Sequence, residues 1–404
     1  MLDAIGLDEV RRAPAYFKAA AKSAQSGIRG KMYITLPSGE TVCLSNGEPG
    51  RISHMVIHNP DMFRVLMRDG WVSFGETYMS GWWSTDDLQG FLDHAYDIEM
   101  DVYDSSLSGS AFARLYEKFR HWLRSNSRAQ AKRNISYHYD LGNQFYGLWL
   151  DDTMTYSSAR FETGQESLEN AQNAKYDSMI TEMGAKPGDH ILEIGCGWGG
   201  FAERAAQEHG LKVTGLTISQ EQFDYAKQRI ARAGLSDRVE IKLCDYRDEK
   251  GTYDGIASIE MFEAVGEKYW PTYFDTVRER LKPGGQATLQ IITVEDSRWD
   301  AYRKSVDFIQ KYIFPGGMLP SPKALRAEIE SAGLRVAKSV EFGQCYSQTL
   351  RRWHETFNER WDDVQSLGFD ERFRRMWNFY LTSCAAGFMS GNCDVTQITV
   401  AKPG

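Results

Sequence analysis

The hydrophobic positions of this chain change their period part-way along it. From about Asn134 onward, short apolar runs alternate with longer segments whose apolar residues recur at helical spacing. This alternation predicts a doubly wound α/β fold on a mainly parallel sheet. The expected strands are His190–Ile194, Lys212–Leu216, Val239–Leu243, Gly255–Ile259 and Ala287–Ile292, with Val336–Val340 and Thr396–Ala401 as an antiparallel edge.

The first part of the chain has mixed patterns. Two alternating runs flank the turn Pro37-Ser38-Gly39, which predicts a hairpin, and two later segments have helical spacing. Gly75–Trp83 is dense in aromatic residues, which suits either a core or a surface that meets acyl chains. Residues 1–105 therefore predict a smaller α+β domain. Its expected strands are Lys31–Leu36 and Glu40–Leu44, and its expected helices are Asp61–Asp69 and Leu88–Tyr96.

Residues 106–133 concentrate positive charge, although the net charge of the chain is −8. Between Ala111 and Arg133 there are seven basic residues and one acidic residue, with aromatic residues interleaved at roughly helical spacing. A basic amphipathic helix of this kind is typical of a membrane-surface contact. An interdomain helix with solvated bases has the same pattern, so both interpretations stay open. We expect a basic linker helix here and a catalytic domain over residues 134–404.

Composition narrows the class of protein further. The acidic balance argues against a nucleic-acid partner, and no apolar run approaches the roughly 20 residues of a membrane span. The N-terminus lacks the layout of a signal peptide. Six cysteines without a C-x-x-C pair and eight scattered histidines predict neither a disulfide framework nor a metal site. We expect a cytoplasmic protein.

The most specific local motif is Leu192–Gly200, an apolar run that ends in Glu193 and a glycine-rich turn. Glycines allow a sharp turn after a parallel strand and let a ligand lie against bare amides. An acidic residue before such a turn suits a ligand with a cationic end and hydroxyls, such as S-adenosylmethionine (SAM). Asp245 and Tyr246 follow two strands later, where SAM enzymes commonly hold the adenine.

A nicotinamide dinucleotide is the alternative ligand for this turn. Gly195, Gly197 and Gly200 satisfy the G-x-G-x-x-G spacing of dinucleotide sites. That interpretation needs an acidic residue at the end of the next strand to hold a ribose. The chain has Thr217–Gln220 there instead. The pattern favours SAM.

Several motifs, in their order and spacing, resemble the cyclopropane-fatty-acyl-phospholipid synthase family, which includes the mycolic acid cyclopropane synthases. Gly75–Trp83 matches the N-terminal domain of the longer bacterial members, so the resemblance covers nearly the whole chain. It implies a class I SAM-dependent methyltransferase with a Rossmann-like sheet and a helical lid, formed by helices over 301–313 and between Leu350 and Phe388. The matching motifs are His138–Asn143, Thr155–Ser157, Glu193–Gly199, Leu216–Gln222, Met261–Glu263, Lys311–Gly317, Met376-Trp377 and Tyr380-Leu381.

The family transfers the SAM methyl group to a cis double bond in a phospholipid acyl chain, which leaves a carbocation. In typical members a bound bicarbonate then removes a proton from the added methyl, and a cyclopropane ring closes. The resemblance implies unsaturated phospholipid acyl chains as substrate, peripheral association with the inner face of the membrane, and compatibility with a homodimer, since longer members are often dimers. The SAM cradle would be Tyr139, Glu193, Gly195, Gly197, Gly199, Thr217, Gln222, Asp245 and Tyr246, with Gln222 on the ribose.

The bicarbonate site departs from the family pattern. Typical members use a Cys, a Glu, a His and a later Tyr; here Glu263 and Tyr346 remain, while the Cys and His positions are Ser158 and Gln290. Ser and Gln still donate hydrogen bonds to an anion, so bicarbonate stays open, but Gln cannot carry a proton as His does. Glu260 stands where the family usually has glycine, and the sequence does not decide whether its side chain points to the site or to solvent.

These departures predict that methyl transfer is intact and deprotonation is altered. We expect a methyl-branched alkene or a methylene product, with the usual cyclopropane as the alternative. Two further alternatives are a SAM methyltransferase of a non-lipid substrate and an inactive lipid-binding homologue. An intact SAM cradle argues against the inactive homologue, because a binding module has no need of one.

Overall fold

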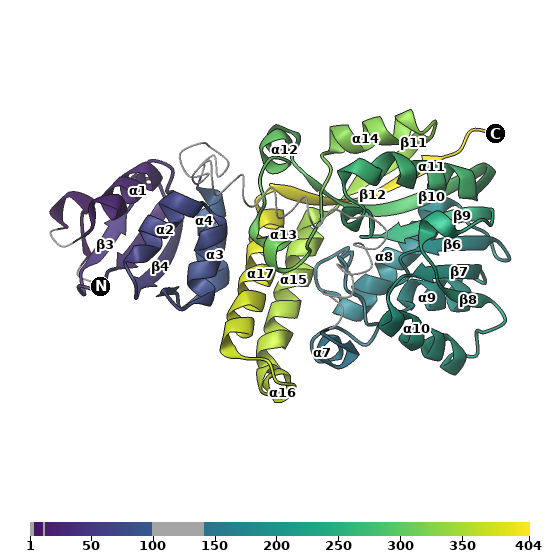
Figure 1. The fold of residues 1–404 in the computed structure, drawn as a ribbon, viewed down its shortest axis with the longest axis horizontal. Coiled ribbons are helices and arrows are strands. Elements are labelled where there is room, and N and C mark those ends of the chain that lie inside the picture. The colour runs from purple at the N-terminus through teal and green to yellow at the C-terminus, as the bar shows by residue number, and fades with distance from the viewer. Residues whose placement is uncertain (1–3, 11–12, 99–140) are drawn as a thin grey trace. The chain divides into compact units, whose positions relative to one another are not determined.

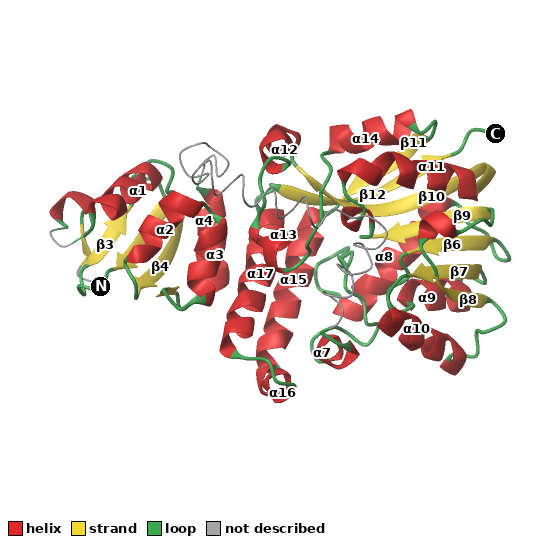
Figure 2. Cartoon of the chain, in the orientation of Figure 1, coloured by secondary structure: helices red, strands yellow, loops and turns green. Residues whose placement is uncertain are grey.

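The computed structural model describes residues 4–10, 13–98 and 141–404, which form two compact units (Figures 1 and 2). The first unit contains the N-terminal residues together with residues 300–313 and 365–390. The second contains the other described residues from 141 onward. The predicted basic helix within residues 106–133 lies outside the described residues.

The described residues of the first unit contain a five-stranded sheet with the strand order β1-β3-β2-β4-β5. The predicted hairpin is confirmed, because β2 and β3 pair antiparallel with Thr35 opposite Thr41. The turn between them places Gly39 at a φ of 87°, a conformation that glycine adopts without steric cost. The strands are β1 (Ala4–Ile5), β2 (Gly30–Thr35), β3 (Thr41–Leu44), β4 (Arg51–Ile57) and β5 (Trp83–Ser84).

Helices of the first unit come from both ends of the chain. The two predicted N-terminal helices are confirmed as α2 and α4, and the C-terminal helix α17 packs against α3 and α4. Gly75 of α3 permits this packing, since a Cβ there would lie 2.5 Å from Phe308 and 2.8 Å from Phe379. The helices are α1 (Ala15–Gln25), α2 (Asp61–Asp69), α3 (Val72–Met79), α4 (Leu88–Asp97), α13 (Phe308–Tyr312) and α17 (Glu371–Met389).

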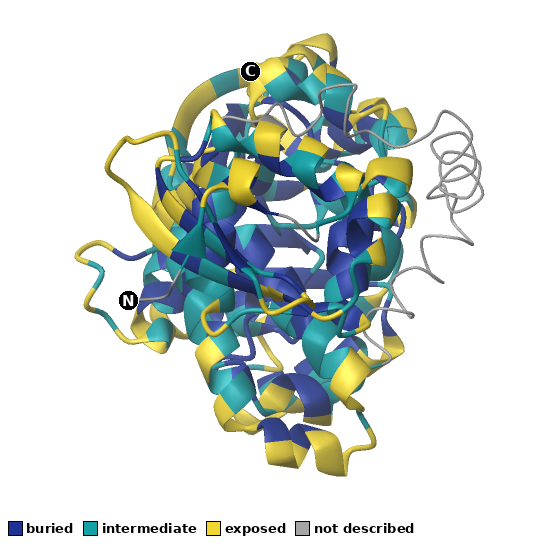
Figure 3. Cartoon of the chain, turned by 90° about the vertical axis from the view of Figure 1, so that its left-hand side faces the viewer, coloured by how far each residue is buried: buried dark blue, intermediate teal, exposed yellow. Residues whose placement is uncertain are grey.

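The aromatic segment Gly75–Trp83 contributes Trp83 to the core of this unit, while Tyr78 and Trp82 are partly exposed. Trp83 is fully buried, and its indole N–H donates to the Phe74 carbonyl at 3.1 Å while the two rings stack at 4.5 Å. Burying aromatic area this way stabilises the unit, and the satisfied N–H removes the cost of a buried donor. Buried positions gather on the inward sides of the elements, as Figure 3 shows.

The second unit's described residues contain a seven-stranded sheet in the order β11-β12-β10-β9-β6-β7-β8. The strands from β6 to β10 are parallel, and β12 runs antiparallel to β10 and β11. All the strands predicted for this region are confirmed. Their bounds are β6 (His190–Ile194), β7 (Lys212–Thr217), β8 (Val239–Leu243), β9 (Tyr253–Ile259), β10 (Leu281–Val294), β11 (Arg335–Glu341) and β12 (Cys393–Ala401).

Helices cover both faces of this sheet, with α8, α9 and α10 on one face and α11 and α14 on the other (Figures 1 and 2). Parallel strands end at one edge of a sheet, so the loops after β6, β7, β8 and β9 meet there. The helices are α7 (Asn143–Gly147), α8 (Leu168–Met183), α9 (Gly200–Glu208), α10 (Gln220–Arg232), α11 (Trp270–Arg280), α12 (Asp296–Tyr302), α14 (Pro322–Ser331), α15 (Gly343–Glu359) and α16 (Trp361–Ser366).

The segments expected to form a lid divide between the units. α15 belongs to the second unit and contacts β12, whereas α13 and α17 pack within the first. The single helix expected over 301–313 is instead the end of α12 followed by α13. Within the described ranges, no helix has both the length and the apolar character that crossing a membrane requires.

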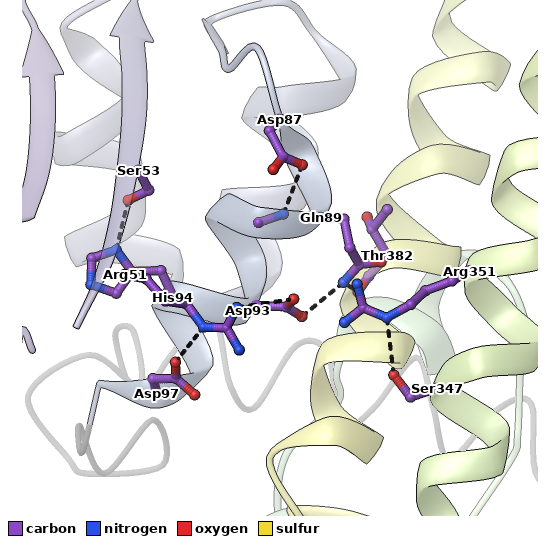
Figure 4. Close-up of polar contacts among 11 residues, drawn as sticks. Arg51, Ser53, Asp87, Gln89, Asp93, His94, Asp97, Ser347, Arg351 and Thr382 are labelled. Atoms are coloured by element: carbon purple, nitrogen blue, oxygen red, sulfur yellow. Dashed lines mark hydrogen bonds and ion pairs between the residues drawn. The ribbon is translucent and has the colours of Figure 1, made fainter. Parts of the chain in front are cut away.

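A buried histidine joins the sheet and a helix of the first unit. His94 of α4 donates its Nε2–H to the Arg29 carbonyl at 2.7 Å, and its Nδ1 lies 2.8 Å from the Ser53 hydroxyl of β4 (Figure 4). Burial lowers the pKa of His94 below 6.5, against the opposing effect of the Arg29 carbonyl. The folded state therefore favours the neutral imidazole.

Acidification should destabilise the first unit through His94. In the unfolded chain His94 takes up a proton near pH 6.5, whereas in the folded chain its lowered pKa keeps it neutral to lower pH. The free energy of unfolding should therefore fall as the pH drops below that value. Chemical denaturation between about pH 7 and about pH 5 measures this slope. His94→Gln should flatten it. An equal slope in wild type and His94→Gln would contradict the assignment.

Candidate active site

The glycine turn after β6 is held open by backbone bonds. The N–H groups of Gly195 and Cys196 both donate to the Leu216 carbonyl of β7, at 3.0 and 2.8 Å. Gly199 caps the following helix α9 in the left-handed conformation. Gly197 has a φ of 51°, and no heavy atom lies within 4 Å of the place a Cβ would take. The turn therefore leaves bare backbone facing open space.

Glu193 lies at the end of β6 beside this turn. Its side chain is 2% exposed, and Oε2 has no hydrogen-bond partner among the described residues. Burial raises the pKa of Glu193 to about 8, while the positive charges of Lys175 and Arg229 oppose the rise. An orphaned buried carboxyl oxygen carries a free-energy cost, and a cationic or hydroxyl-bearing ligand at this edge would relieve it.

The end of the next strand joins two further predicted residues. Thr217 closes β7, and its hydroxyl donates to Oε1 of Gln222 at 2.9 Å. Both side chains are buried, and Ser219 caps α10 by accepting from the Gln222 N–H. Because the amide oxygen of Gln222 already accepts this hydrogen bond, the NH₂ group of Gln222 is the end that can donate to a ribose hydroxyl.

Asp245 follows β8, and its carboxylate already has a partner within the chain. Its carboxylate forms a bidentate pair with Arg247, at 2.8 Å to Nε and 2.5 Å to Nη2. The guanidinium also lies over the Tyr246 ring, 5.5 Å from its centroid. Arg247 therefore fixes both predicted adenine-side residues in place. The remaining predicted cradle residue, Tyr139, lies outside the described residues.

These features fit SAM. Open backbone at Gly197, an unsatisfied carboxyl oxygen on Glu193 and the oriented Gln222 amide offer surfaces for a cationic amino acid end and a ribose. When bound, SAM would supply an electrophilic methyl group. Among the described residues, no group of three or more His, Cys, Asp or Glu side chains could hold a metal.

Three of the four predicted catalytic positions donate hydrogen bonds to the side chain of Glu260. Oε1 of Glu260 accepts from the Ser158 N–H and from Nε2 of Gln290, both at 2.8 Å. Oε2 accepts from the Tyr346 hydroxyl at 2.6 Å. Glu263 follows three residues later, in a turn after β9. The question that the sequence left open is answered, because Glu260 points into the site.

Ser158 and Gln290 have fixed orientations in this cluster. The Gln290 amide oxygen accepts from Nε2 of Gln397 at 3.1 Å, so its NH₂ group must face Glu260. The Ser158 hydroxyl donates to the Ala159 carbonyl at 2.9 Å, so only its backbone N–H serves the carboxylate. Both residues are fully buried.

The two carboxyl groups have different environments. Burial raises the pKa of Glu260, but the Tyr346 hydroxyl, the charge of Lys175 and the Gln290 and Ser158 donors all oppose it. Burial and the charge of Glu260 raise the pKa of Glu263 to about 8, opposed by the Ile292 N–H at 2.6 Å. Glu260 is the better hydrogen-bonded of the two carboxyl groups, and near neutral pH Glu263 holds a proton.

Lys175 is a site residue that the sequence interpretation missed. It is fully buried on α8, and its ammonium donates to the Ser157 hydroxyl at 2.7 Å and to Gln172 Oε1 at 2.6 Å. Burial lowers its pKa, and the negative charge of Glu260 is the largest influence that opposes this. The available signal was its position: Lys175 occupies an inward-facing place in a helix, between buried Ala171 and Met179.

Comparison with known proteins agrees with this geometry. Residues 126–398 match the family model described as mycolic acid cyclopropane synthetase. The chain belongs to this family. It is 42% identical over 375 residues to the tuberculostearic acid methyltransferase UfaA1 of Mycobacterium tuberculosis, covering 88% of this chain and 84% of that protein. It is 35% identical over 354 residues to the cyclopropane-fatty-acyl-phospholipid synthase of Escherichia coli, covering 86% and 87%.

A solved structure of the mycolic acid cyclopropane synthetase family shares the fold. Mycolic acid cyclopropane synthase CmaA1, in a crystal structure complexed with SAH and CTAB, superposes with a TM-score of 0.63 and 30% identity, covering 67% of this chain and 98% of that chain. The protein is a SAM-dependent methyltransferase of this lipid-modifying family, with a class I methyltransferase fold.

Gly197→Ala should block cofactor binding at a small cost in stability. The added methyl would enter the open space beside the turn and lower SAH affinity by about tenfold or more, while the left-handed backbone costs about 1 kcal/mol. Gly234→Ala is the matched control, because Gly234 has a φ of 69° with nothing within 4 Å and lies after α10. Calorimetric SAH titration should separate the two variants; equal SAH affinities would contradict the placement.

Proposed function

We propose that this chain transfers a methyl group from SAM to the cis double bond of an unsaturated phospholipid acyl chain. We further propose that the product is a methyl-branched alkene or a methylene chain. The observation that carries the product assignment is the fixed orientation of Ser158 and Gln290, at the positions where the family has Cys and His.

Aromatic side chains beside the carboxylates support an acyl substrate. The Tyr346 ring meets Trp353 at 6.2 Å, and Trp353 meets Tyr156 at 5.3 Å and Trp149 at 5.7 Å. An alkene is a weak nucleophile, so a site for its methylation must exclude water and align the double bond. An apolar wall next to the carboxylates suits both tasks.

The proton-handling residues support the altered product. In this chain the Gln290 amide cannot accept a proton near neutral pH, and its two ends are bonded to Gln397 and Glu260. The Ser158 hydroxyl is turned toward a backbone carbonyl. A cationic methylated acyl chain would therefore lose its proton to a site that lacks the family's His and Cys. Similarity to the tuberculostearic acid methyltransferase supports the same outcome.

The conventional cyclopropane product is the second candidate. Similarity to the Escherichia coli cyclopropane-fatty-acyl-phospholipid synthase favours it. Glu263 and Tyr346 are retained, and Tyr346 contributes a donor to the site. The two products contain the same atoms and differ in which C–H bond is broken.

Labelled lipid should identify the product. A host that makes unsaturated phospholipids, fed with methyl-labelled methionine and expressing this chain, should accumulate fatty acids heavier by one labelled methylene. We expect that species to take up hydrogen on catalytic hydrogenation, because an alkene reduces and a cyclopropane resists. Mass spectrometry before and after hydrogenation measures this.

Expression of Gly197→Ala provides the matched negative control, since it should keep the fold and lose SAM. A labelled species that resists hydrogenation would overturn the product assignment and favour the cyclopropane. Absence of any labelled lipid with wild-type chain would overturn the lipid substrate.

Delivery to the bilayer is part of the proposal. We propose that the basic segment within residues 106–133 binds the anionic inner surface of the membrane, so that an acyl chain can be drawn into the site. The positive charge of this segment supports the proposal, because basic residues near an anionic surface each contribute about 1 kcal/mol.

Charge reversal in this segment should weaken binding to anionic vesicles and leave SAH affinity unchanged. The variant replaces Arg124, Arg128, Lys132 and Arg133 with Glu. A matched control reverses exposed bases of the second unit, Lys186, Lys212, Lys323 and Arg326. Co-sedimentation should fall for the first variant and less for the second. Equal losses in both would indicate a general charge effect and rule out a dedicated segment.

A further inference from the structure

The Glu260 carboxylate is bonded on both oxygens by groups from three separate parts of the chain. Its donors are the Ser158 N–H, the Gln290 amide and the Tyr346 hydroxyl, at 2.6 to 2.8 Å. Those donors occupy three of the positions that the family resemblance assigns to bicarbonate. A carboxylate and a bicarbonate ion present the same planar pair of oxygens, so the same donors suit either anion.

We propose that Glu260 takes the place of bicarbonate in this chain and is the base that deprotonates the methylated acyl chain. The residues present do not fit an additional bicarbonate ion. The Ser158 N–H and the Gln290 NH₂ group are already directed at Glu260, and the Ser158 hydroxyl is turned away. A second anion would also meet the negative charge of Glu260.

The backbone at Glu260 supports a dedicated role. Its φ is 48°, in the left-handed region that side chains other than glycine, Asn and Asp seldom adopt. The family usually has glycine at this position, which has no such restriction. A glutamate kept in a conformation that suits glycine indicates that its carboxylate is needed there.

The positive charge of Lys175 also supports Glu260 as the base. The positive charge of Lys175 lowers the pKa of Glu260, and its ammonium donates to the hydroxyl of Ser157, the neighbour of the donor Ser158. A positive charge beside the carboxyl group favours its ionised form, which is the form that can accept a proton. Glu263 is held by one backbone donor and retains its own proton, so it does not compete.

The step balances without a further reactant. The alkene π electrons form a carbon–carbon bond to the methyl group as the sulfur–methyl bond breaks, and the sulfur keeps that electron pair. The chain is left with a positive charge on the adjacent carbon. Glu260 takes a proton from the chain or its new methyl, and the C–H electron pair forms the double bond or closes the ring. The proton then resides on the Glu260 carboxyl.

This inference rests on the proposed lipid methylation, but it holds for either product. Which C–H bond breaks decides the product, and the base is the same group in both cases. The test therefore measures dependence on bicarbonate, separately from product identity.

The first measurement uses the purified full chain with SAM and vesicles of an unsaturated anionic phospholipid. Lipid methylation is followed in CO₂-free buffer with and without added sodium bicarbonate. We expect equal rates for the wild type. A wild-type rate that depends on bicarbonate would overturn the proposal.

Two variants at the same position form the matched pair. Glu260→Gly vacates the anion site, so methylation should fall by about 100-fold or more in CO₂-free buffer and recover with bicarbonate. Glu260→Gln keeps the shape and fills the site without a base, so it should show the same fall and no recovery. Full activity of Glu260→Gln, or recovery of both variants, would overturn the proposal.

Binding provides a readout independent of turnover. Titration calorimetry in CO₂-free buffer should detect bicarbonate binding to Glu260→Gly and none to the wild type, with equal SAH affinity in both. Bicarbonate binding to the wild type would overturn the inference. If the wild type methylates no lipid, the proposed function fails, and this titration still decides whether Glu260 holds the anion's place. Should Glu260→Gly not fold, Glu260→Gln and the wild type decide the outcome.

Discussion

A carboxyl group in the largely apolar interior at the edge of a sheet must have its oxygens satisfied by hydrogen bonds, and for Glu260 this requirement organises the site. Glu260 receives donors from the segment before α8, from β10 and from α15. Removing any of them would leave a desolvated carboxylate oxygen unpaired, at a cost larger than the bond itself contributes. The strand order and the placement of α15 serve to bring these donors to one point.

The two neighbouring carboxyl groups, Glu260 and Glu263, have different surroundings. Glu260 has three donors and the Lys175 charge, whereas Glu263 has backbone donors and the charge of Glu260 beside it. Two similar side chains thus have different hydrogen-bond and charge environments. Burial raises the pKa of Glu193, at the end of β6, and its Oε2 has no hydrogen-bond partner among the described residues. Under the proposed function, Glu193 would face the cofactor and Glu260 the acyl chain.

The two halves of the chemistry rest on different parts of the second unit. The glycine turn, the Thr217–Gln222 pair and the Asp245–Arg247 pair are features of the parallel sheet's loops and fit SAM. The proposed proton removal would instead depend on side chains from β10, from α15 and from the segment around Ser158. The two sets share none of the hydrogen bonds named above, so under the proposed function we expect substitutions in the second group to change the product more than methyl transfer.

Local patterns determined much of this protein. The strands of the large sheet, the hairpin around Gly39 and the glycine turn at Gly195 follow from hydrophobic period and turn chemistry, which act over a few residues. The direction of Glu260 was decided only by the tertiary structure. Its donors lie 102, 30 and 86 residues away in the chain. No short-range pattern contains a contact of that length, so only folding of the sheet and α15 could turn this carboxylate into the site.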